Sequence, residues 1–335
     1  MTKFKRKYLY AIAFSVFSLF ALGCNSAKET AELNVAESIK LNPGAVLKSE
    51  NGSYSLYDYE EKYIKHEPDK VVLTYDKDSG SYIYRENNDT FAVYNKKENK
   101  IDGGNYIKLK LSPGGEYCSY FVEDNGMKLK VLGLKDNKEI KLDSNVSISG
   151  SIYDWYDNNS IIYYGVSDDG VNGIFINNIK ENKEELLYKI KEGYVAYLKA
   201  TLNNILLFQL DFENERQLVM IDKETKNVEV LNNNVEVIKD IITLNDDIFF
   251  VGRIKDNVDS IYKIINGDTK RVVYDFPARI DVEKGIKADK NGDILFIGSN
   301  EINGSTEQLY KYSSDGSISS VSDKSSDFAF VDYVE

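Results

Sequence analysis

The sequence predicts an all-β fold for residues 45–335. Short runs of β-branched and aromatic residues recur in this region, and Asn, Asp and Gly interrupt them, as expected for strands joined by tight turns. Helical periodicity is scarce there, and the contents of 42% apolar and 29% charged residues are typical of a globular chain. The runs also return at a nearly constant interval, which indicates repeated units.

Six apolar runs follow turn-like segments at intervals of about 43 residues. They begin at Ser81, Cys118, Ile161, Ile205, Ile248 and Ile294. A second strand follows each run across a polar loop, and a shorter third run follows most of these. Such units are typical of β-propeller blades, because each small sheet buries its faces against its neighbours in a ring. Residues 294–297, ILFI, are apolar on both faces, as a strand between two blades requires.

The two ends of this region determine the predicted number of blades. Residues 326–335, SDFAFVDYVE, stand about one period after residues 285–290, where an innermost strand is expected, and no complete unit follows them. Residues 45–67 contain up to three strand-like runs without an innermost strand before them. Joined, the two segments complete a seventh blade and remove open sheet edges. We therefore expect seven blades, with a six-bladed ring, an eight-bladed ring or a sandwich as alternatives.

Residues 1–23 are expected to be a signal peptide that is removed. Four cations precede an apolar run of about 16 residues, shorter than the roughly 20 that a membrane-spanning helix needs. Residues 21–24, Ala-Leu-Gly-Cys, resemble a bacterial lipobox. The resemblance implies cleavage after Gly23 and attachment of diacylglycerol and a fatty acid, such as palmitate, to Cys24. An uncleaved signal anchor is the alternative.

Residues 24–44 are expected to form a lipidated tether. Two or three acyl chains hold a protein firmly on a bilayer, and twenty flexible residues reach roughly 25 Å. The formal charge is −12, and removal of the four N-terminal cations makes the remaining chain more acidic. Such a body repels nucleic acid, so no nucleic-acid partner is expected. We expect a protein held by its lipid anchor on the extracytoplasmic face of the cell membrane.

Residues 111–142 resemble the repeats of TolB-like and dipeptidyl-peptidase-IV-type propellers. Ser112-Pro113-Gly114-Gly115 matches their Ser-Pro-Asp-Gly turn, with Gly114 in place of the usual Asp. Residues 161–188 and 248–274 are similar to Tyr-rich propellers of bacterial surface lipoproteins. The resemblance covers most of residues 70–326 and implies a propeller with a protein-binding or scaffold role.

No catalytic residue is expected. Propeller peptidases carry their Ser-His-Asp triad on a separate hydrolase domain, for which this chain has no room, and it has no G-x-S-x-G elbow. Its single histidine, His66, lies in a predicted loop beside Glu67 and is interpreted as solvated.

No cofactor other than the covalent lipid is expected. Clusters of His and Cys are absent from the sequence, which argues against zinc. Three Asp- and Gly-rich segments, 76–80, 167–170 and 289–293, are interpreted as turns rather than calcium loops. The best weak calcium candidates are Asp289, Asn291 and Asp293.

Tyr153, Trp155 and Tyr156 form a candidate binding patch. Clustered aromatic residues can stack a sugar or anchor a partner, although packing between blades is the alternative interpretation. Cys118 lies within a predicted strand and is expected to pack as a small apolar residue.

Taken together, these features predict a non-catalytic binding or scaffold module for an envelope protein or a cell-wall glycan. The alternative is a propeller enzyme, namely a lyase, lactonase or glycan hydrolase that uses carboxylates in the central channel. A sensor or accessory subunit of a larger envelope complex is a third possibility. An enzyme should have convergent buried carboxylates, whereas a scaffold should have a filled channel and exposed aromatic side chains.

Overall fold

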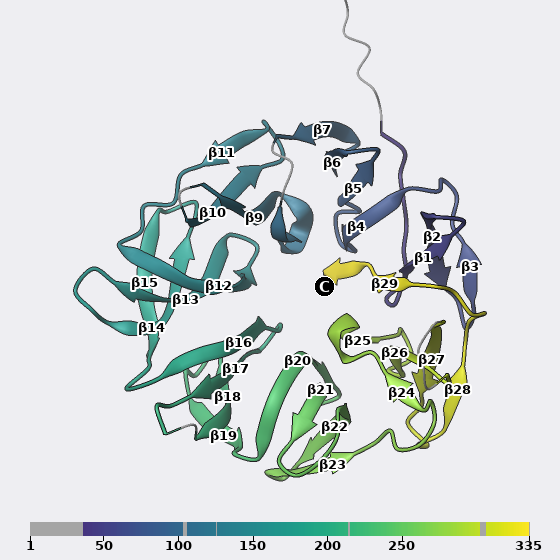
Figure 1. Ribbon diagram of the computed structural model, residues 1–335. Coiled ribbons are helices and arrows are strands. Elements are labelled where there is room, and N and C mark those ends of the chain that lie inside the picture. The colour runs from purple at the N-terminus through teal and green to yellow at the C-terminus, as the bar shows by residue number, and fades with distance from the viewer. Residues whose placement is uncertain (1–35, 103–105, 125, 214, 302–305, 335) are drawn as a thin grey trace, which may run out of the picture. The chain divides into compact units, whose positions relative to one another are not determined.

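A computed structural model describes residues 36–102, 106–124, 126–213, 215–301 and 306–334. Its strands form seven small sheets arranged in a ring (Figure 1). This is a seven-bladed β-propeller, as the sequence predicts, and the six-bladed, eight-bladed and sandwich alternatives are wrong. We number the blades 1 to 7 and give the strands of each from the axis outward.

The first three blades contain both ends of the described chain. Blade 1 contains β29 (Phe328–Phe330), β1 (Val46–Glu50), β2 (Ser53–Tyr59) and β3 (Tyr63–Lys65). Blade 2 contains β30 (Asp332–Val334), β4 (Val71–Asp76), β5 (Tyr82–Glu86), β6 (Asp89–Tyr94) and β7 (Lys97–Ile101). Blade 3 contains β8 (Ile107–Leu111), β9 (Tyr117–Glu123), β10 (Met127–Gly133) and β11 (Lys138–Ile140).

The other four blades follow in chain order. Blade 4 contains β12 (Val146–Asp157), β13 (Ser160–Ser167), β14 (Asn172–Asn178) and β15 (Lys183–Lys189). Blade 5 contains β16 (Tyr194–Ala200), β17 (Asn204–Leu210), β18 (Arg216–Asp222) and β19 (Val228–Asn232). Blade 6 contains β20 (Val235–Leu244), β21 (Asp247–Ile254), β22 (Ser260–Ile265) and β23 (Asp268–Arg271). Blade 7 contains β24 (Arg279–Ile280), β25 (Ile286–Ala288), β26 (Ile294–Ser299), β27 (Gln308–Tyr312) and β28 (Ile318–Ser320). Two 3-10 turns, η1 (Pro113–Gly115) and η2 (Val282–Lys284), are the helical elements of the described residues.

The core lies between the blades, and strands such as β26 are buried on both faces. In β26, Phe296 packs with Phe249 of blade 6, whereas Ile297 packs with Val46 of blade 1. Phe296 and Ile297 are fully buried. Burial of this kind stabilises by about 25 cal/mol per Å² of apolar surface, so the ring is held together by its inter-blade surfaces.

The two ends of the chain close the ring, as the sequence predicts. Strand β29 pairs antiparallel with β1, with Val46 opposite Phe330. The structure adds one feature that was not predicted: after Val331 the chain continues as β30, which pairs in parallel with β4 of blade 2. The last described residues therefore belong to two neighbouring blades and lie near the axis (Figure 1).

The Ser-Pro-Gly-Gly turn lies between β8 and β9 of blade 3 and contacts blade 2. The backbone N–H of Gly114 donates to Oδ2 of Asp76 at 2.9 Å. Gly115 has a φ of +63°, and a Cβ at this position would lie 2.4 Å from Cβ of Ser81, so only glycine fits. This turn therefore uses backbone groups to link two blades.

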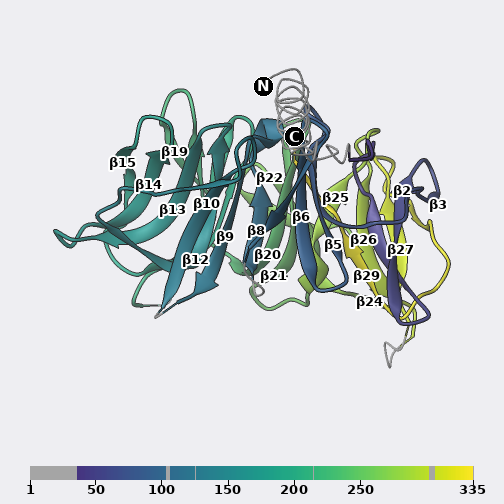
Figure 2. The same ribbon diagram turned by 90° about the horizontal axis from the view of Figure 1, so that it is seen from above.

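The loops lie on two faces, which we name by where the described chain begins. The N–H of Ala36 donates to the carbonyl of Lys96 in the turn between β6 and β7. We call this side, which carries the turns from the first to the second and from the third to the fourth strands when β4 is counted as the first strand of blade 2, the tether face. The loops from second to third strands and between blades form the opposite side, the far face (Figure 2).

Candidate functional site

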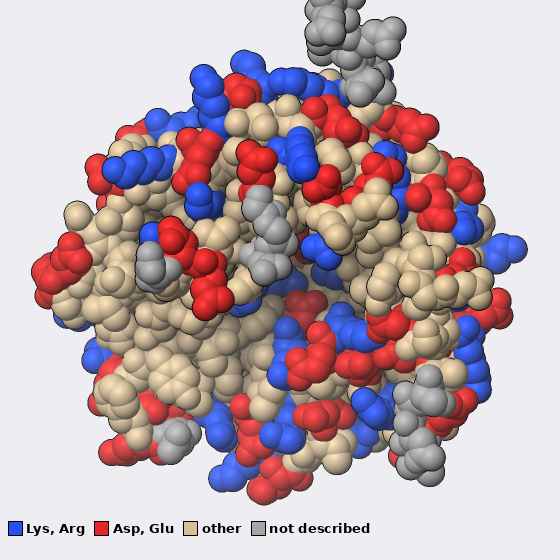
Figure 3. Space-filling model, turned by 45° about the horizontal axis from the view of Figure 1, so that its top comes forward, with Lys and Arg blue, Asp and Glu red and all other residues tan. Residues whose placement is uncertain are grey.

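Charged side chains of alternating sign line the axis of the propeller. They are Lys110 in β8, Asp154 in β12, Lys199 in β16, Asp240 in β20, Lys287 in β25 and Asp332 in β30. We call these six residues the channel ring. Figure 3 shows basic and acidic atoms within the hollow at the centre of the molecule.

Three ion pairs connect consecutive positions of the channel ring. The Nζ–Oδ1 distances are 2.6 Å for Lys110–Asp154, 2.7 Å for Lys199–Asp240 and 3.9 Å for Lys287–Asp332. The partners of each pair come from different sheets. Each ion pair therefore links two sheets that share no backbone hydrogen bonds at this point.

Two of the carboxylates also reach the blade that follows their own. Asp154 Oδ2 accepts a hydrogen bond from the N–H of Ala200 at 2.9 Å, and Asp240 Oδ2 accepts one from Ile286 at 3.3 Å. Gly285, with a φ of +73°, allows the second contact, since a Cβ there would lie 2.8 Å from Asp240 Oδ2. Each of these aspartates therefore connects three blades.

The electrostatics of the channel favour the charged forms of Asp240 and Lys110. Burial opposes ionisation of Asp240, but the charges of Lys199 and Lys287 outweigh it and hold the pKa of Asp240 below its usual value. Burial likewise opposes protonation of Lys110, but Asp154 raises the pKa of Lys110 above its ordinary value. Both groups are therefore charged at neutral pH.

The arrangement of these groups bears on the chemistry that the channel can perform. A general acid or base must accept or release a proton near neutral pH, whereas the paired Asp240 holds its charge. A cation would compete with lysine for Asp154 and Asp240. Among the described residues, no group of three or more His, Cys, Asp or Glu side chains is placed to hold a metal ion. The channel ring is best suited to connecting blades.

The predicted binding patch of Tyr153, Trp155 and Tyr156 is divided between core and surface. Tyr153 and Trp155 are only 2% and 5% exposed. They pack with Phe121 and Tyr117 of blade 3, which is the packing alternative stated above. Tyr156 is half-buried, and the ammonium group of Lys223 lies 4.5 Å from the centre of its ring.

The weak calcium candidates form a turn. Asp289 Oδ1 accepts hydrogen bonds from the N–H groups of Asn291 at 2.8 Å and Asp293 at 2.9 Å. The ammonium group of Lys311 lies 2.8 Å from the carboxylate of Asp293. These contacts match the turn interpretation of the segment. His66 lies in the loop between β3 and β4, and its backbone N–H donates to the carbonyl of Leu56.

The predicted lipidation and cleavage residues, Cys24 and Gly23, lie outside the described residues. Within the described part of the chain, no helix has the length and apolar character needed to cross a membrane. Cys118 is fully buried, and burial raises the pKa of its thiol well above the ordinary value.

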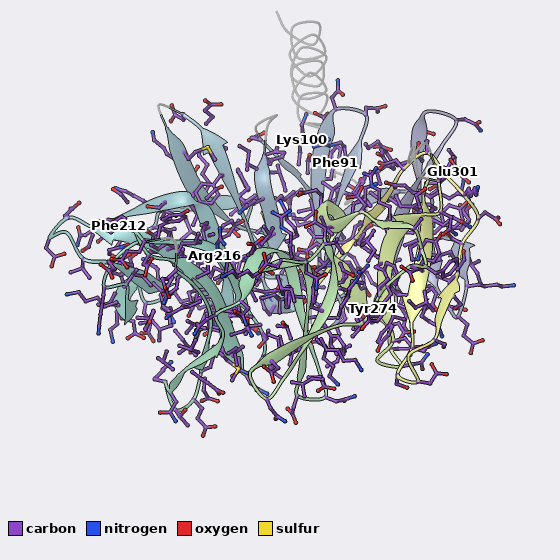
Figure 4. All side chains as sticks on the ribbon, turned by 60° about the horizontal axis from the view of Figure 1, so that its bottom comes forward. Phe91, Lys100, Phe212, Arg216, Tyr274 and Glu301 are labelled. Atoms are coloured by element: carbon purple, nitrogen blue, oxygen red, sulfur yellow. The ribbon has the colours of Figure 1, made fainter. Side chains whose placement is uncertain are left out.

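The far face carries most of the large apolar side chains that are exposed. They are Tyr54, Ile107, Met127, Val166, Tyr194, Phe212, Val258, Tyr274 and Phe276. Phe212, at 79% exposure, lies between β17 and β18 of blade 5, where Figure 4 labels it together with Arg216 of the same hairpin. On the tether face, the most exposed apolar residue is Leu202, at 87%. The far face is therefore the better candidate for binding a partner.

Sequence reasoning missed the channel ring, although the sequence contains a signal for it. The six charged residues recur at about the blade period and alternate in sign. Each lies in or near an innermost strand, and these strands are more polar and more often bulged than the second strands, as in β8 and β20. A search for periodic charges rather than periodic apolar runs would have found them.

The fold and the channel define the class of protein, a seven-bladed β-propeller, and solved structures share this fold. An oligogalacturonate lyase from Vibrio parahaemolyticus has a TM-score of 0.53 at 12% identity, over 85% of each chain. A prolyl endopeptidase structure has a TM-score of 0.52 at 12% identity, over 96% of this chain and 55% of the other. TolB from Acinetobacter baumannii has a TM-score of 0.46 at 12% identity, over 86% of this chain and 67% of the other.

The similarities to the lyase and the endopeptidase, at low identity, show the fold alone. No family model matches the sequence. No curated protein matches it either.

Proposed function

We propose that this protein is a lipid-anchored, extracytoplasmic binding module whose propeller holds an envelope protein or a cell-wall component through its far face. The observation that carries the proposal is the asymmetry between the two faces. Exposed aromatic side chains such as Phe212 and Tyr274 gather on the far face, and such residues dominate binding hot spots. The described chain begins on the opposite face, at Ala36.

The anchor rests on the sequence. The cationic start, the short apolar run and the Cys at its end support lipidation of Cys24 after cleavage behind Gly23. About 12 residues separate Cys24 from Ala36, and a flexible segment of this length reaches roughly 20 Å. The propeller would then stay close to the membrane.

The channel favours a binding module over a propeller enzyme. The alternative requires carboxylates that are free to hold a metal or exchange a proton. Asp154 and Asp240 are instead bound to lysines and to backbone N–H groups of the next blade. These carboxylates are bound to other groups of the protein, whereas the exposed side chains of the far face contact solvent.

Membrane fractionation of cells expressing the Cys24→Ser variant tests the anchor. We expect the wild type in the membrane fraction with a lipidated Cys24 at its N-terminus by mass spectrometry, and the variant without lipid and with an altered N-terminus. A variant that stays in the membrane fraction with an unchanged N-terminus would refute lipidation. Affinity capture from cross-linked membranes tests the binding role, and recovery of no specific partner would count against it.

A further inference from the structure

One part of the far face combines exposed aromatic groups with uncompensated negative charge. Its apolar part consists of Val166, Tyr194 and Phe212, which are 38%, 47% and 79% exposed. We call these three residues the aromatic patch. It lies across the boundary between blades 4 and 5.

Contacts across the boundary between blades 4 and 5 connect the three residues of the aromatic patch. Val166 is paired with Asn172 in blade 4, and Asn172 Nδ2 donates to the carbonyl of Gly193 at 3.0 Å. Gly193 packs so closely on Leu210 that a Cβ would lie 1.9 Å from the carbonyl oxygen of Leu210. Tyr194, the next residue, is paired with the same Leu210, two residues before Phe212. The three residues therefore lie on neighbouring strands and loops at the boundary between blades 4 and 5.

The two loops beside the aromatic patch are strongly acidic. Residues 168–171 and 211–215 contain five carboxylates and no Lys or Arg. They are Asp168, Asp169, Asp211, Glu213 and Glu215. No ion pair is found for any of the five among the described residues. The loop between the two blades adds Lys191 and Glu192, whose charges cancel.

We infer that the aromatic patch binds a basic segment of a partner protein that carries an aromatic or aliphatic anchor residue. This inference rests on the proposed binding function and names the partner class. The exposed ring of Phe212 provides an apolar contact, and the carboxylates on either side attract Lys or Arg and steer the approach. Anionic lipid is repelled by the same carboxylates, and a neutral glycan leaves their charge unused.

Substitutions in the exposed loop separate the two contributions. Phe212→Ser removes the apolar anchor, and the double variant Glu213→Gln, Glu215→Gln removes two charges. Asp211 is left intact because its Oδ1 accepts the N–H groups of Glu213 and Glu215 and holds the loop. None of the three substituted side chains is buried, so folding should be unaffected.

The tether face offers matched controls. Leu202→Ser removes an equally exposed apolar side chain, and the double variant Glu60→Gln, Glu61→Gln removes two exposed charges. Leu202→Ser removes an apolar side chain as Phe212→Ser does, and the two double variants change the net charge by the same amount. Nonspecific attraction to an acidic protein would affect test and control variants equally.

The experiment measures binding of fluorescent 12-residue peptides to the full-length protein in phosphatidylcholine nanodiscs. The first peptide contains lysine and phenylalanine, the second glutamate and phenylalanine, and the third lysine and serine. Only the first peptide should bind saturably. Its Kd should rise at least about tenfold with Phe212→Ser. The Glu213→Gln, Glu215→Gln variant should raise the Kd roughly threefold at about 0.05 M salt and less at high salt. The two controls should match the wild type.

Several results would overturn the inference. One is the absence of saturable binding of the lysine–phenylalanine peptide. Another is an equal loss of peptide affinity with Leu202→Ser and with Phe212→Ser. Phe212-dependent binding of cellohexaose or of phosphatidylglycerol vesicles, in place of the peptide, would assign the aromatic patch to a glycan or a lipid. If the wild type captures a specific partner and Phe212→Ser captures it equally well, the inference fails while the proposed function stands.

Discussion

Replacement of Asp240 by alanine should destabilise the propeller by about 3 kcal/mol. Removing one partner of a buried ion pair costs about 3–5 kcal/mol, because the remaining charge loses its compensation. The side chains of Asp240 and Lys199 are 16% and 27% exposed, so the cost should lie at the lower end of this range. The N–H groups of Ile241 and Ile286 also lose the carboxylate that accepts their hydrogen bonds.

A double-mutant cycle with Lys199→Met isolates the ion pair from these other losses. We expect a coupling energy of about 2 kcal/mol between positions 199 and 240. The pair Lys100–Asp89 is the matched control, since its atoms are 2.9 Å apart but its side chains are 52% and 50% exposed. Its coupling energy should be below about 1 kcal/mol.

Equilibrium urea denaturation provides the measurement. Trp155 is the only tryptophan of the chain and is 5% exposed, so its fluorescence reports loss of the packing between blades 3 and 4. The slope of the free energy of unfolding against urea should be the same for all variants. If positions 199 and 240 couple no more strongly than the exposed control pair, the channel ring does not hold the blades together.

Three further predictions follow from single contacts. The depressed pKa of Asp240 and the raised pKa of Lys110 imply that these two groups contribute fully to stability between about pH 4 and pH 10. In thermal unfolding, the contribution of Asp240 should be lost as the pH falls below about 4, and that of Lys110 as the pH rises above about 10; variants lacking these groups should show flatter profiles. Gly285→Ala should cost at least about 2 kcal/mol, because its Cβ would meet Asp240, whereas Gly316→Ala, with a similar φ and open space around it, should cost about 1 kcal/mol; equal losses in urea denaturation would contradict this. Cys118 should resist alkylation by iodoacetamide in the folded protein and react in urea, since burial raises its thiol pKa; rapid labelling of the native state would disprove its burial.

The second strands of the blades were the most predictable part of the fold. A strand such as β26 is apolar on both faces because two neighbouring blades cover it, so its sequence alone marks its position. Ring closure was also predictable, since residues 326–335 had the pattern of an innermost strand without a blade of its own. The division of that segment into β29 and β30 was not, because parallel pairing with β4 depends on where the ring brings the two strands together.

The candidate sites were harder to predict for a physical reason. Tyr153 and Trp155 have the composition of a binding patch, yet a ring of sheets buries aromatic residues as readily as it exposes them. Phe212 lies in a short polar loop and stands out only when its exposure is known. The lysines and aspartates of the channel look like ordinary surface charges in a linear sequence, because their pairing depends on which blades become neighbours.

The position of β30 also constrains the order in which this protein can be completed. Strand β29 supplies the innermost strand of blade 1, and Asp332 supplies the last charge of the channel ring. Because the chain is synthesised from its N-terminus, the ring stays unfinished until these last strands have been made. Closure has to wait for these final residues, so a truncated product would keep an unpaired strand β1 and stay open to proteases.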